Sequence, residues 1–498
     1  MHDTLSTPAA GSSVRAAFRS PRLLTTEVLA GLVTSLALIP EVISFAVIAG
    51  VDPKVALYTS CIMAITIAFV GGRPAMVSAA AGATALVIAP LVASHGIDYL
   101  IAAVWLAGAL QILFAVAGLA RLVRFIPRSV MIGFVNALAV LIFSAQIRHL
   151  VDVPWLVYPL VAAGLAMIVL VPKLTTSVPA PLIAIVVLTA AVALFHLDVP
   201  DVADQGELPS GLPTWMIPDV PLTWETLTII APFAVGLALV GLLESLLTAK
   251  LVDDITDTPS DKTREAWGQG VANIAGAVFG GMGGCAMIGQ TMINVKEGRA
   301  RTRISTFLAG AFLLVLCVTV GDVVGAIPMA ALVAVMLVIA VTTFDWRSIA
   351  PRTLRLMPRS ETLVMVVTVV GTLATHNLAV GVVLGVLTAM VAFARRVAHM
   401  TRIDVVDGEC DGVAERTYRV SGELFWASSN DLIHRFDYAD DPDSVVIDLS
   451  GADVWDASTV ATLDAVQHKY AVRGKDVRIV GLDGSSLNRL ERLSGRLG

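Results

Sequence analysis

The sequence predicts an α-helical membrane protein with many spans, followed by a small α/β domain. Three observations carry this prediction. The chain of 498 residues is 56% hydrophobic and only 15% charged, whereas soluble domains are about 25% charged. Apolar runs of about 20 residues, the length that crosses a bilayer, recur from Val28 to Phe393. After Arg402 the sequence becomes polar, and strand-like runs alternate with helix-like runs, which indicates a sheet covered by helices.

The apolar runs predict fourteen spans, which divide into two halves of seven. The spans lie near residues 26–49, 54–71, 77–94, 98–120, 129–148, 154–172, 179–197, 225–250, 263–280, 287–297, 303–322, 327–343, 361–377 and 379–398. An odd number of spans per half inserts the second half upside down, which gives the inverted repeat of many secondary transporters. We therefore expect a lead at residues 1–22, a membrane domain at 23–400 and a soluble domain at 403–498.

The charges of the connecting loops predict the orientation. With the N-terminus inside, almost all Lys and Arg residues of the short loops, Arg121 and Arg124 among them, fall on the cytoplasmic side. The outer loops then receive only Lys54 and Arg148, and the long outer loop at 198–224 has carboxylates but no Lys or Arg. We therefore expect a multi-pass protein of the inner or plasma membrane with both termini in the cytoplasm.

Two glycine-interrupted stretches, residues 69–84 and 279–294, resemble each other. Each runs from a Phe and a glycine pair into Ala-Met, and each is too short in apolar length for a plain transmembrane helix. Such a pair in the two halves of a membrane protein points to a transporter binding site. A helix that starts inside the membrane presents unpaired N–H groups and partial positive charge, which favour an anion. The alternative is that these glycines only allow close helix packing.

Two carboxylates stand out within the predicted spans, where burying an ionisable side chain costs roughly 3 kcal/mol. Glu41 follows Pro40 in the first span, and the proline is expected to break the helix there. Glu244 lies in the eighth span, with Thr248 one turn further on the same face. These spans are equivalent in the two halves, so each carboxylate could exchange a proton or coordinate a cation during transport. The alternative is a hydrogen bond or salt bridge that packs helices together.

Several motifs together resemble the SulP anion transporters, the bacterial relatives of the animal sulfate and chloride/bicarbonate exchangers that include pendrin and prestin. The motifs are Ala30-Gly31-Leu32-Val33 with Ile39-Pro40, Gly71-Gly72-Arg73-Pro74, Ile126-Pro127-Arg128-Ser129-Val130-Met131-Ile132-Gly133-Phe134, Glu244-Ser245-Leu246-Leu247-Thr248-Ala249, and Ala272-Asn273 with Gly280-Gly281-Met282. The resemblance covers nearly the whole chain, and the last domain resembles the STAS domain that closes such transporters.

The resemblance implies a core domain of spans 1–4 and 8–11, a gate domain of spans 5–7 and 12–14, an elevator-like movement of core against gate, and a homodimer. Carried over by position, the substrate-binding residues are Glu41, Ser78, Ala79, Ala80, Ile288, Gly289, Gln290 and Thr291. The residues implied in ion coupling, with H⁺ or Na⁺, are Glu41, Glu244 and Thr248.

The chain departs from the family pattern in two places. Gly289-Gln290 stands where many members have a hydroxyl residue and an Arg, which weakens the site for a doubly charged oxyanion such as sulfate. A substrate that enters with a proton, or a carboxylate that hydrogen-bonds Gln290, becomes more plausible. In the STAS loop, Ser458 keeps the position that is phosphorylated in anti-sigma-factor antagonists, but Ala457 and Thr459 differ. The alternative to a regulatory phosphosite is a helix N-cap at Asp456 or Ser458.

These observations predict a secondary transporter of a small anion of the bicarbonate, sulfate or dicarboxylate class, coupled to H⁺ or Na⁺. A channel-like uniporter and a nucleobase permease of the same fold are the alternatives. The sequence contains no nucleophile–base pair, phosphate loop or metal-ligand cluster, and its four cysteines form no CxxC pair. We therefore expect no enzymatic activity, no cofactor or metal, and no nucleic-acid partner, whereas the STAS domain could bind a cytoplasmic partner.

Overall fold

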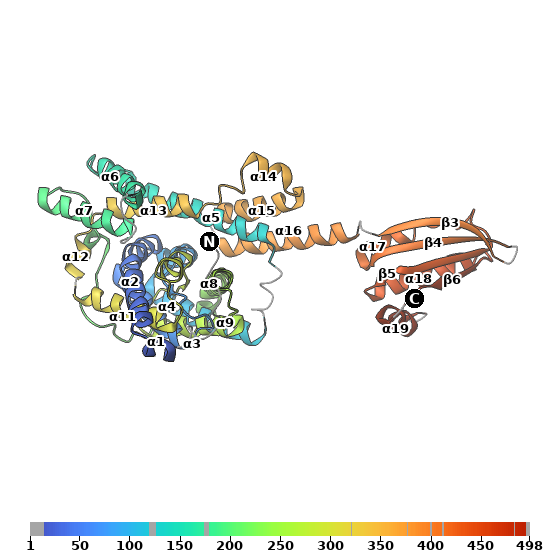
Figure 1. Cartoon of the computed structure of the whole chain (residues 1–498), viewed down its shortest axis with the longest axis horizontal. Coiled ribbons are helices and arrows are strands. Elements are labelled where there is room, and N and C mark those ends of the chain that lie inside the picture. Colours follow the sequence, from blue (N-terminus) through green and yellow to red (C-terminus); the bar gives the residue numbers. More distant parts are fainter. Residues whose placement is uncertain are drawn as a thin grey trace. The chain divides into compact units, whose positions relative to one another are not determined.

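The computed structural model describes residues 14–118, 126–173, 179–319, 321–375, 377–398, 401–410, 413–482 and 484–494. Residues 1–13 of the predicted lead, and Arg121 and Arg124 of a predicted cytoplasmic loop, lie outside this part. The chain divides into two compact units, Met1–Val386 and Leu387–Gly498 (Figure 1). The first unit is made of helices and one two-stranded ladder, and the second contains a four-stranded sheet.

The helices of the first unit follow one another through mostly short connections. They are α1 (Val14–Arg19), α2 (Pro21–Ala49), α3 (Pro53–Val70), α4 (Gly82–Val116), α5 (Arg128–Ile147), α6 (Val157–Leu170), α7 (Ala180–Phe195), α8 (Trp224–Thr256), α9 (Lys262–Val278), α10 (Ile288–Met292), α11 (Arg303–Thr319), α12 (Gly321–Gly325), α13 (Met329–Thr343), α14 (Pro351–Leu356), α15 (Arg359–Thr375) and α16 (Leu378–Ala398). The last of these, α16, runs across the boundary between the two units.

Every predicted span contains a helix within the described residues. The third and fourth spans are joined in α4, which Gly96 interrupts with a φ of +81° that glycine adopts without strain. In the described part of the chain, 6 helices are long and apolar enough to cross a membrane, and four other apolar helices have 10–17 residues. The number of segments that cross the membrane therefore stays a prediction.

The helices of the first unit pack in two groups. In one group, α4 lies along α8 and α9, while α11 lies along α2 and α3. In the other group, α5 packs against α13 and α15, and α13 also packs against α6 and α7. Figure 1 shows the second group as a layer along the upper side of the unit in that view. The groups touch where α2 meets α7 and α13, and where α4 meets α5.

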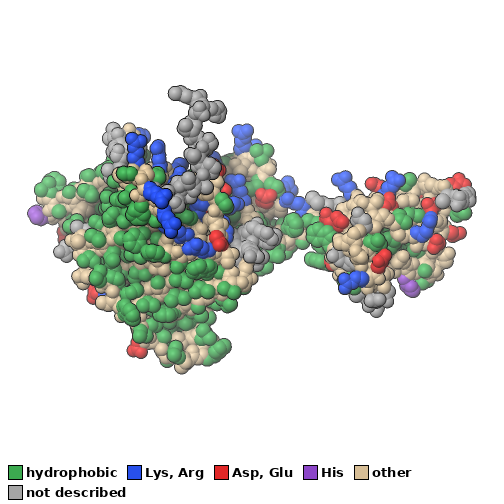
Figure 2. Space-filling model, turned by 60° about the horizontal axis from the view of Figure 1, so that its bottom comes forward, with side chains coloured by type: hydrophobic (Ala, Val, Ile, Leu, Met, Phe, Trp, Pro, Cys, Tyr) green, Lys and Arg blue, Asp and Glu red, His purple; other side chains and the backbone are tan. Residues whose placement is uncertain are grey.

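The long loop before α8 contacts segments that the sequence predicts on the same, outer side. Its hydrogen bonds join Lys54 N to Glu207 O (3.0 Å), Asp219 N to Asp98 Oδ1 (3.2 Å), Met216 N to Val278 O (2.9 Å) and Val202 N to Ile327 O (3.0 Å). Figure 2 shows apolar side chains over much of the visible surface of this unit, with Lys and Arg side chains gathered in its upper part. The segments predicted on the outer side lie together, which supports the predicted alternation of the connecting loops between the two sides of the membrane. The side on which the termini lie stays a prediction.

The second unit contains a sheet in the order β3-β4-β5-β6, formed by β3 (Arg402–Cys410), β4 (Val413–Leu424), β5 (Ser444–Val454) and β6 (Asp476–Val480). β3 and β4 are antiparallel, whereas β4, β5 and β6 are parallel neighbours. The accompanying helices are α17 (Trp426–Leu432), α18 (Ala457–Ala471) and α19 (Gly484–Leu493). The strand-like runs of the sequence, at 417–420, 445–449 and 477–480, lie in β4, β5 and β6, whereas β3 was not predicted, because that edge strand is mostly exposed and lacks apolar alternation.

Candidate functional site

Two short strands, one from each half of the chain, cross within the first unit. β1 (Ser78–Ala79) pairs antiparallel with β2 (Cys285–Ala286), so that Ser78 lies opposite Ala286 and Ala79 opposite Cys285. A helix follows each strand almost at once: α4 begins at Gly82 and α10 at Ile288. Because the strands are antiparallel, α4 and α10 leave the ladder from its opposite ends and lead away in opposite directions.

The third predicted span begins later than the sequence suggests. Residues 77–81 are buried but not helical, and the helix starts at Gly82 rather than at residue 77. The reason is that the backbone of Val77 bonds outside its own segment. Met287 N donates to Val77 O at 3.0 Å, and the Thr291 hydroxyl accepts from Val77 N at 3.1 Å. These bonds keep the chain extended as far as the crossing point.

The start of α10 borders open space. Ile288 is half-buried, whereas Gly289 is exposed, and a Cβ added at Gly289 would meet nothing within 4 Å. α10 continues without a break into a π-helical turn, Ile293–Glu297. On the other side of the crossing, a Cβ at Gly82 would lie 2.8 Å from the Phe45 ring. The first N–H groups of a helix have no partner within it and carry partial positive charge, so an anion can be bound in the open space beside Gly289.

Gln290 is the predicted site residue with the clearest need of a partner. Its side chain is fully buried, yet neither its Oε1 nor its Nε2 has a hydrogen-bond partner among the described residues. The carboxyl group of Glu41, on α2, lies beside this amide and is itself partly exposed. A buried polar group without a partner costs about 1–3 kcal/mol. The arrangement therefore favours a ligand with both hydrogen-bond donors and acceptors.

Ser78, Ala79 and Ala80 are fully buried and support the site rather than offering free side chains to it. The Ser78 hydroxyl accepts a hydrogen bond from Gln269 Nε2 at 2.6 Å. The backbone N–H of Ala80 donates to the Ser60 hydroxyl of α3 at 3.1 Å. The predicted location of these residues on the third span is wrong, since they belong to β1 and to the turn that leads into α4.

The two predicted coupling residues of α8 both lie against β2. Oε2 of Glu244 accepts a hydrogen bond from the Cys285 thiol at 3.0 Å. The Thr248 hydroxyl is 2.8 Å from Glu244 O and 3.2 Å from Ala286 O, and the Ser245 hydroxyl accepts from Ala286 N at 3.0 Å. Glu244 is buried and forms no ion pair with a described residue. A proton or cation bound at Glu244 would thus directly change the electrostatic potential at β2, the strand that precedes α10.

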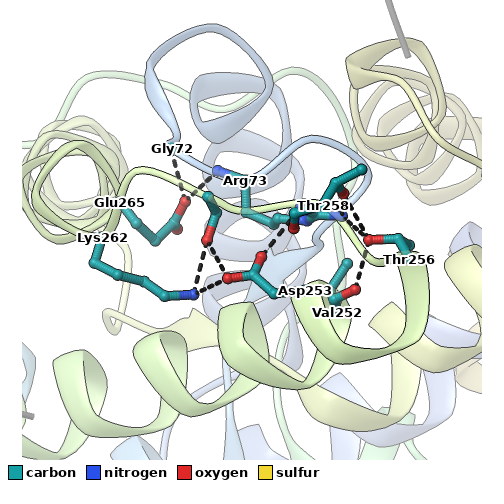
Figure 3. Close-up of polar contacts among 9 residues, drawn as sticks. Gly72, Arg73, Val252, Asp253, Thr256, Thr258, Lys262 and Glu265 are labelled. Carbon is teal, nitrogen blue, oxygen red and sulfur yellow. Dashed lines mark hydrogen bonds and ion pairs between the residues drawn. The ribbon is translucent and has the colours of Figure 1, made fainter. Parts of the chain in front are cut away.

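Sequence reasoning missed a polar cluster that fastens the loop before β1 (Figure 3). The Arg73 guanidinium pairs with Asp253 at 3.0 Å, and Lys262 Nζ binds the other oxygen of the same carboxylate at 2.6 Å. Oε2 of Glu265 accepts the backbone N–H groups of Gly72 (2.7 Å) and Arg73 (2.9 Å). The loop between α3 and β1 is therefore held by the α8–α9 connection, a contact that joins the two halves and leaves no signal in local sequence.

Two cavities of the structure lie away from the crossed strands. One cavity of about 320 Å³ is lined by Val47, Asp52 and Arg148, among others, at the end of α2. Another, of about 390 Å³, is lined by Trp455 and Ser486 in the second unit. The features that mark the crossed strands as a candidate site are therefore the unpaired polar groups and the space beside α10.

In the STAS-like unit, Asp456 is the N-cap of α18. Its Oδ1 accepts the backbone N–H of Thr459 at 3.0 Å, which satisfies an otherwise free amide of the first turn. This confirms one of the two expected N-cap residues. Ser458 is exposed in that first turn, and its phosphorylation stays a prediction.

Comparison with known proteins gives a consistent family. Residues 24–159 and 153–368 match the Sulfate permease family, and residues 408–494 match the STAS domain. The chain is 49% identical over 468 residues to the putative sulfate transporter YbaR of Bacillus subtilis. The matched region covers 94% of this chain and 96% of the relative. That degree of identity over almost the whole length shows common descent.

Two solved structures show the same fold. The transmembrane domain of the cyanobacterial bicarbonate transporter BicA matches 74% of this chain and 98% of its own, with a TM-score of 0.63 and 22% identity. The murine Slc26a9 anion transporter in its inward-facing state matches 94% of this chain and 87% of its own, with a TM-score of 0.79 and 16% identity. The chain therefore belongs to the Sulfate permease family, as a multi-pass membrane transporter with a C-terminal STAS domain, and is not an enzyme.

Proposed function

We propose that this protein is a secondary transporter of a small oxyanion of the sulfate and bicarbonate class, bound where α4 and α10 start. The observation that carries the proposal is the buried Gln290 amide, unpartnered at both polar atoms, beside the open space at Gly289. The names of the relatives, a putative sulfate transporter and a bicarbonate transporter, support this substrate class. Membership of the Sulfate permease family argues against the nucleobase permease.

Within that class, the site favours a singly charged anion that carries a hydrogen. Helix starts supply roughly half a positive charge each, and the α10 start presents a neutral Gln290 where an Arg would add a full charge. Gln290 Oε1, which has no partner, can accept from a donor on the anion, and Nε2 can donate both to the anion and to the adjacent Glu41 carboxylate. Bicarbonate and a half-protonated dicarboxylate offer both, whereas sulfate offers acceptors only. We therefore propose bicarbonate, or a monoprotonated carboxylate, as a better substrate than sulfate.

The coupling ion, H⁺ or Na⁺, would bind at Glu244 and Thr248, with Glu41 as the second acid. Glu244 and Thr248 both touch β2, through the Cys285 thiol and the Ala286 carbonyl. Neutralising Glu244 therefore changes the electrostatics of the strand that leads into α10 and strengthens binding of the anion there. This linkage is what symport requires, because each ligand must raise the affinity for the other.

An elevator-like movement is supported by where the crossed strands are anchored. Hydrogen bonds to β1, β2 and the residues beside them come from Ser60 of α3, Ser245 of α8, Asn273 of α9 and Thr306 of α11. Among the described residues, none comes from α5, α6, α7, α13 or α15. The site would thus move as one body with the first helix group, the predicted core, against the second, the predicted gate. A homodimer, which the resemblance implies, stays a prediction.

Uptake into proteoliposomes tests this function. Purified full-length protein should accumulate bicarbonate under an imposed pH or sodium gradient, with weaker accumulation of sulfate. Gln290→Ala should raise the KM for the anion, because the buried amide that can bond the anion is lost. Glu244→Gln should abolish the response to the gradient while downhill uptake continues.

Two results would contradict the proposal. Anion uptake that ignores both gradients and proceeds at channel rates would favour the uniporter. Unchanged gradient-driven uptake in both Glu244→Gln and Glu41→Gln would remove the coupling role of these carboxylates.

A further inference from the structure

Three buried polar side chains lie on one face of α9, at a spacing of four residues. They are Glu265, Gln269 and Asn273, and the side chain of each is fully buried. We refer to these three residues as the α9 spine. The spine lies between the two halves of the chain, and each of its members bonds to a segment that leads into the crossed strands.

Asn273 holds the segment that enters β2. Its Oδ1 accepts the backbone N–H of Gly284 at 2.8 Å, and its Nδ2 donates to the carbonyl of the same residue at 3.1 Å. Nδ2 also donates to Gln111 Oε1 of α4 at 2.9 Å. One side chain therefore satisfies both backbone groups of Gly284, as a neighbouring strand would do. Cys285, the first residue of β2, follows directly.

Gln269 and Glu265 hold β1 and the loop before it. Gln269 Nε2 donates to the Ser78 hydroxyl at 2.6 Å and to Glu265 Oε1 at 2.8 Å. Glu265 Oε2 in turn accepts the amides of Gly72 and Arg73. The spine thus connects both strands to a single helix, although they come from opposite halves of the chain.

The helix that carries the spine is itself fixed against α4. A Cβ at Gly108 of α4 would lie 2.7 Å from the carbonyl oxygen of Gly270, and a Cβ at Gly270 would lie 2.6 Å from that of Gly108. The two backbones therefore approach each other closely at these glycines, with the side chains of Ile112 and Ile274 packed beside them. A ladder of two residue pairs is far too short to hold its own position. The hydrogen bonds of the spine to Ser78 and Gly284 therefore fix the position of both strands relative to α9.

We propose that Gln269 and Asn273 are positioning residues of the anion site, which hold β1 and β2 crossed so that the first amides of α4 and α10 face the same point. The proposal rests on the proposed function, in that an anion binds there. Positioning matters because a displacement of about 1 Å can cost as much as a hundredfold in rate. Neither side chain needs to touch the anion.

The first test measures kinetics in proteoliposomes with radiolabelled bicarbonate and sulfate. Asn273→Ala and Gln269→Ala should each raise the KM about tenfold or more, because the helix starts lose their fixed orientation. The matched control is Asn136→Ala. Asn136 is also a buried Asn, whose Oδ1 accepts Asp345 N at 2.8 Å and whose Nδ2 donates to Ser348 at 2.9 Å, in the second helix group. It should lower thermal stability without changing the KM.

The second test does not depend on the identity of the anion. Cys285 is a free, fully buried cysteine at the crossing point, so its labelling by N-ethylmaleimide, read by mass spectrometry of its peptide, reports whether the crossing is intact. Asn273→Ala should accelerate labelling at least tenfold over both the parent protein and Asn136→Ala. Gln269→Ala, which acts on the opposite strand, serves if Asn273→Ala does not fold.

The outcomes separate the two proposals. If the parent protein takes up neither anion, the proposed function fails, and the labelling rates still decide whether the spine holds the strands. A raised KM with faster labelling supports the positioning role. An unchanged KM, an unchanged labelling rate, or an equal rise of both in Asn136→Ala overturns it.

Discussion

Gly284→Ala is the sharpest perturbation of the crossed strands that the structure offers. A Cβ at this position would lie 2.1 Å from Ala79 O, where ordinary van der Waals contact begins at 3.4 Å. The strands would have to separate by at least 1.3 Å, the difference between these two distances. Ala79 O is backbone and cannot rotate away, as a flexible side chain could. We expect a destabilisation of about 1–3 kcal/mol from overpacking and, because the helix starts move apart, a fall in anion uptake of about a hundredfold.

The assay compares initial uptake rates and thermal unfolding of the purified variant with those of Gly276→Ala. Gly276 lies on α9 close to the crossing, and it is buried, but a Cβ there would meet its nearest neighbour only at 3.9 Å. The control should therefore fold and transport almost like the parent protein. If Gly284→Ala transports at the parent rate, the strands do not need their close approach, and the location of the site at their crossing is refuted.

Three further changes test other parts of the structure. Asp253→Ala should lower the free energy of unfolding by about 3–5 kcal/mol, since the buried Arg73 loses its carboxylate partner. Lys262→Ala, which removes a partly exposed side chain from the same carboxylate, should lower it by at most about 1 kcal/mol. Thermal unfolding measures both changes. Tyr418→Phe should destabilise the STAS unit by about 1.5–3 kcal/mol, because it removes a donor to a buried carboxylate, and hydrogen exchange would show this in the sheet. Gly289→Ala should leave stability within about 0.5 kcal/mol but reduce uptake of sulfate more than that of the smaller bicarbonate, because the new methyl group enters the space beside α10.

The sequence located the two interrupted segments but not their correspondence. The repeated Ala-Met pair suggested that Ala75-Met76 and Ala286-Met287 are equivalent. In the structure α10 starts directly after Met287, whereas α4 starts only six residues after Met76. Helix starts are set by backbone bonds to distant segments, here from Met287 N and the Thr291 hydroxyl to Val77. Such bonds leave no periodic signal, so glycine spacing predicted an interruption and could not place it.

The α9 spine was missed for a related reason. Glu265, Gln269 and Asn273 lie in a segment predicted as the ninth span, and their spacing of four residues was visible in the sequence. The sequence marks a carboxylate as a transport residue only where apolar neighbours surround it, as at Glu41 and Glu244. α9 is less apolar than its neighbours, and of these three residues only Asn273 belongs to a motif that the sequence singled out. Their partners, such as Ser78 and Gly284, belong to other segments and were revealed only by the fold.

The contacts between the two helix groups indicate what an elevator movement has to break. Arg148, at the end of α5, donates through Nη2 to Val47 O near the end of α2, at 2.5 Å. This bond joins the second group to the first on the predicted outer side, next to the cavity of about 320 Å³. The hydrogen bonds that hold the crossed strands all come from helices of the first group, so these bonds can stay intact when that group shifts. The Arg148 bond spans the interface and cannot survive a shift of several ångströms, since a hydrogen bond is lost beyond about 3.5 Å. In the proposed elevator movement, the barrier would therefore lie in such interface contacts, and the anion site would stay rigid while its access changes.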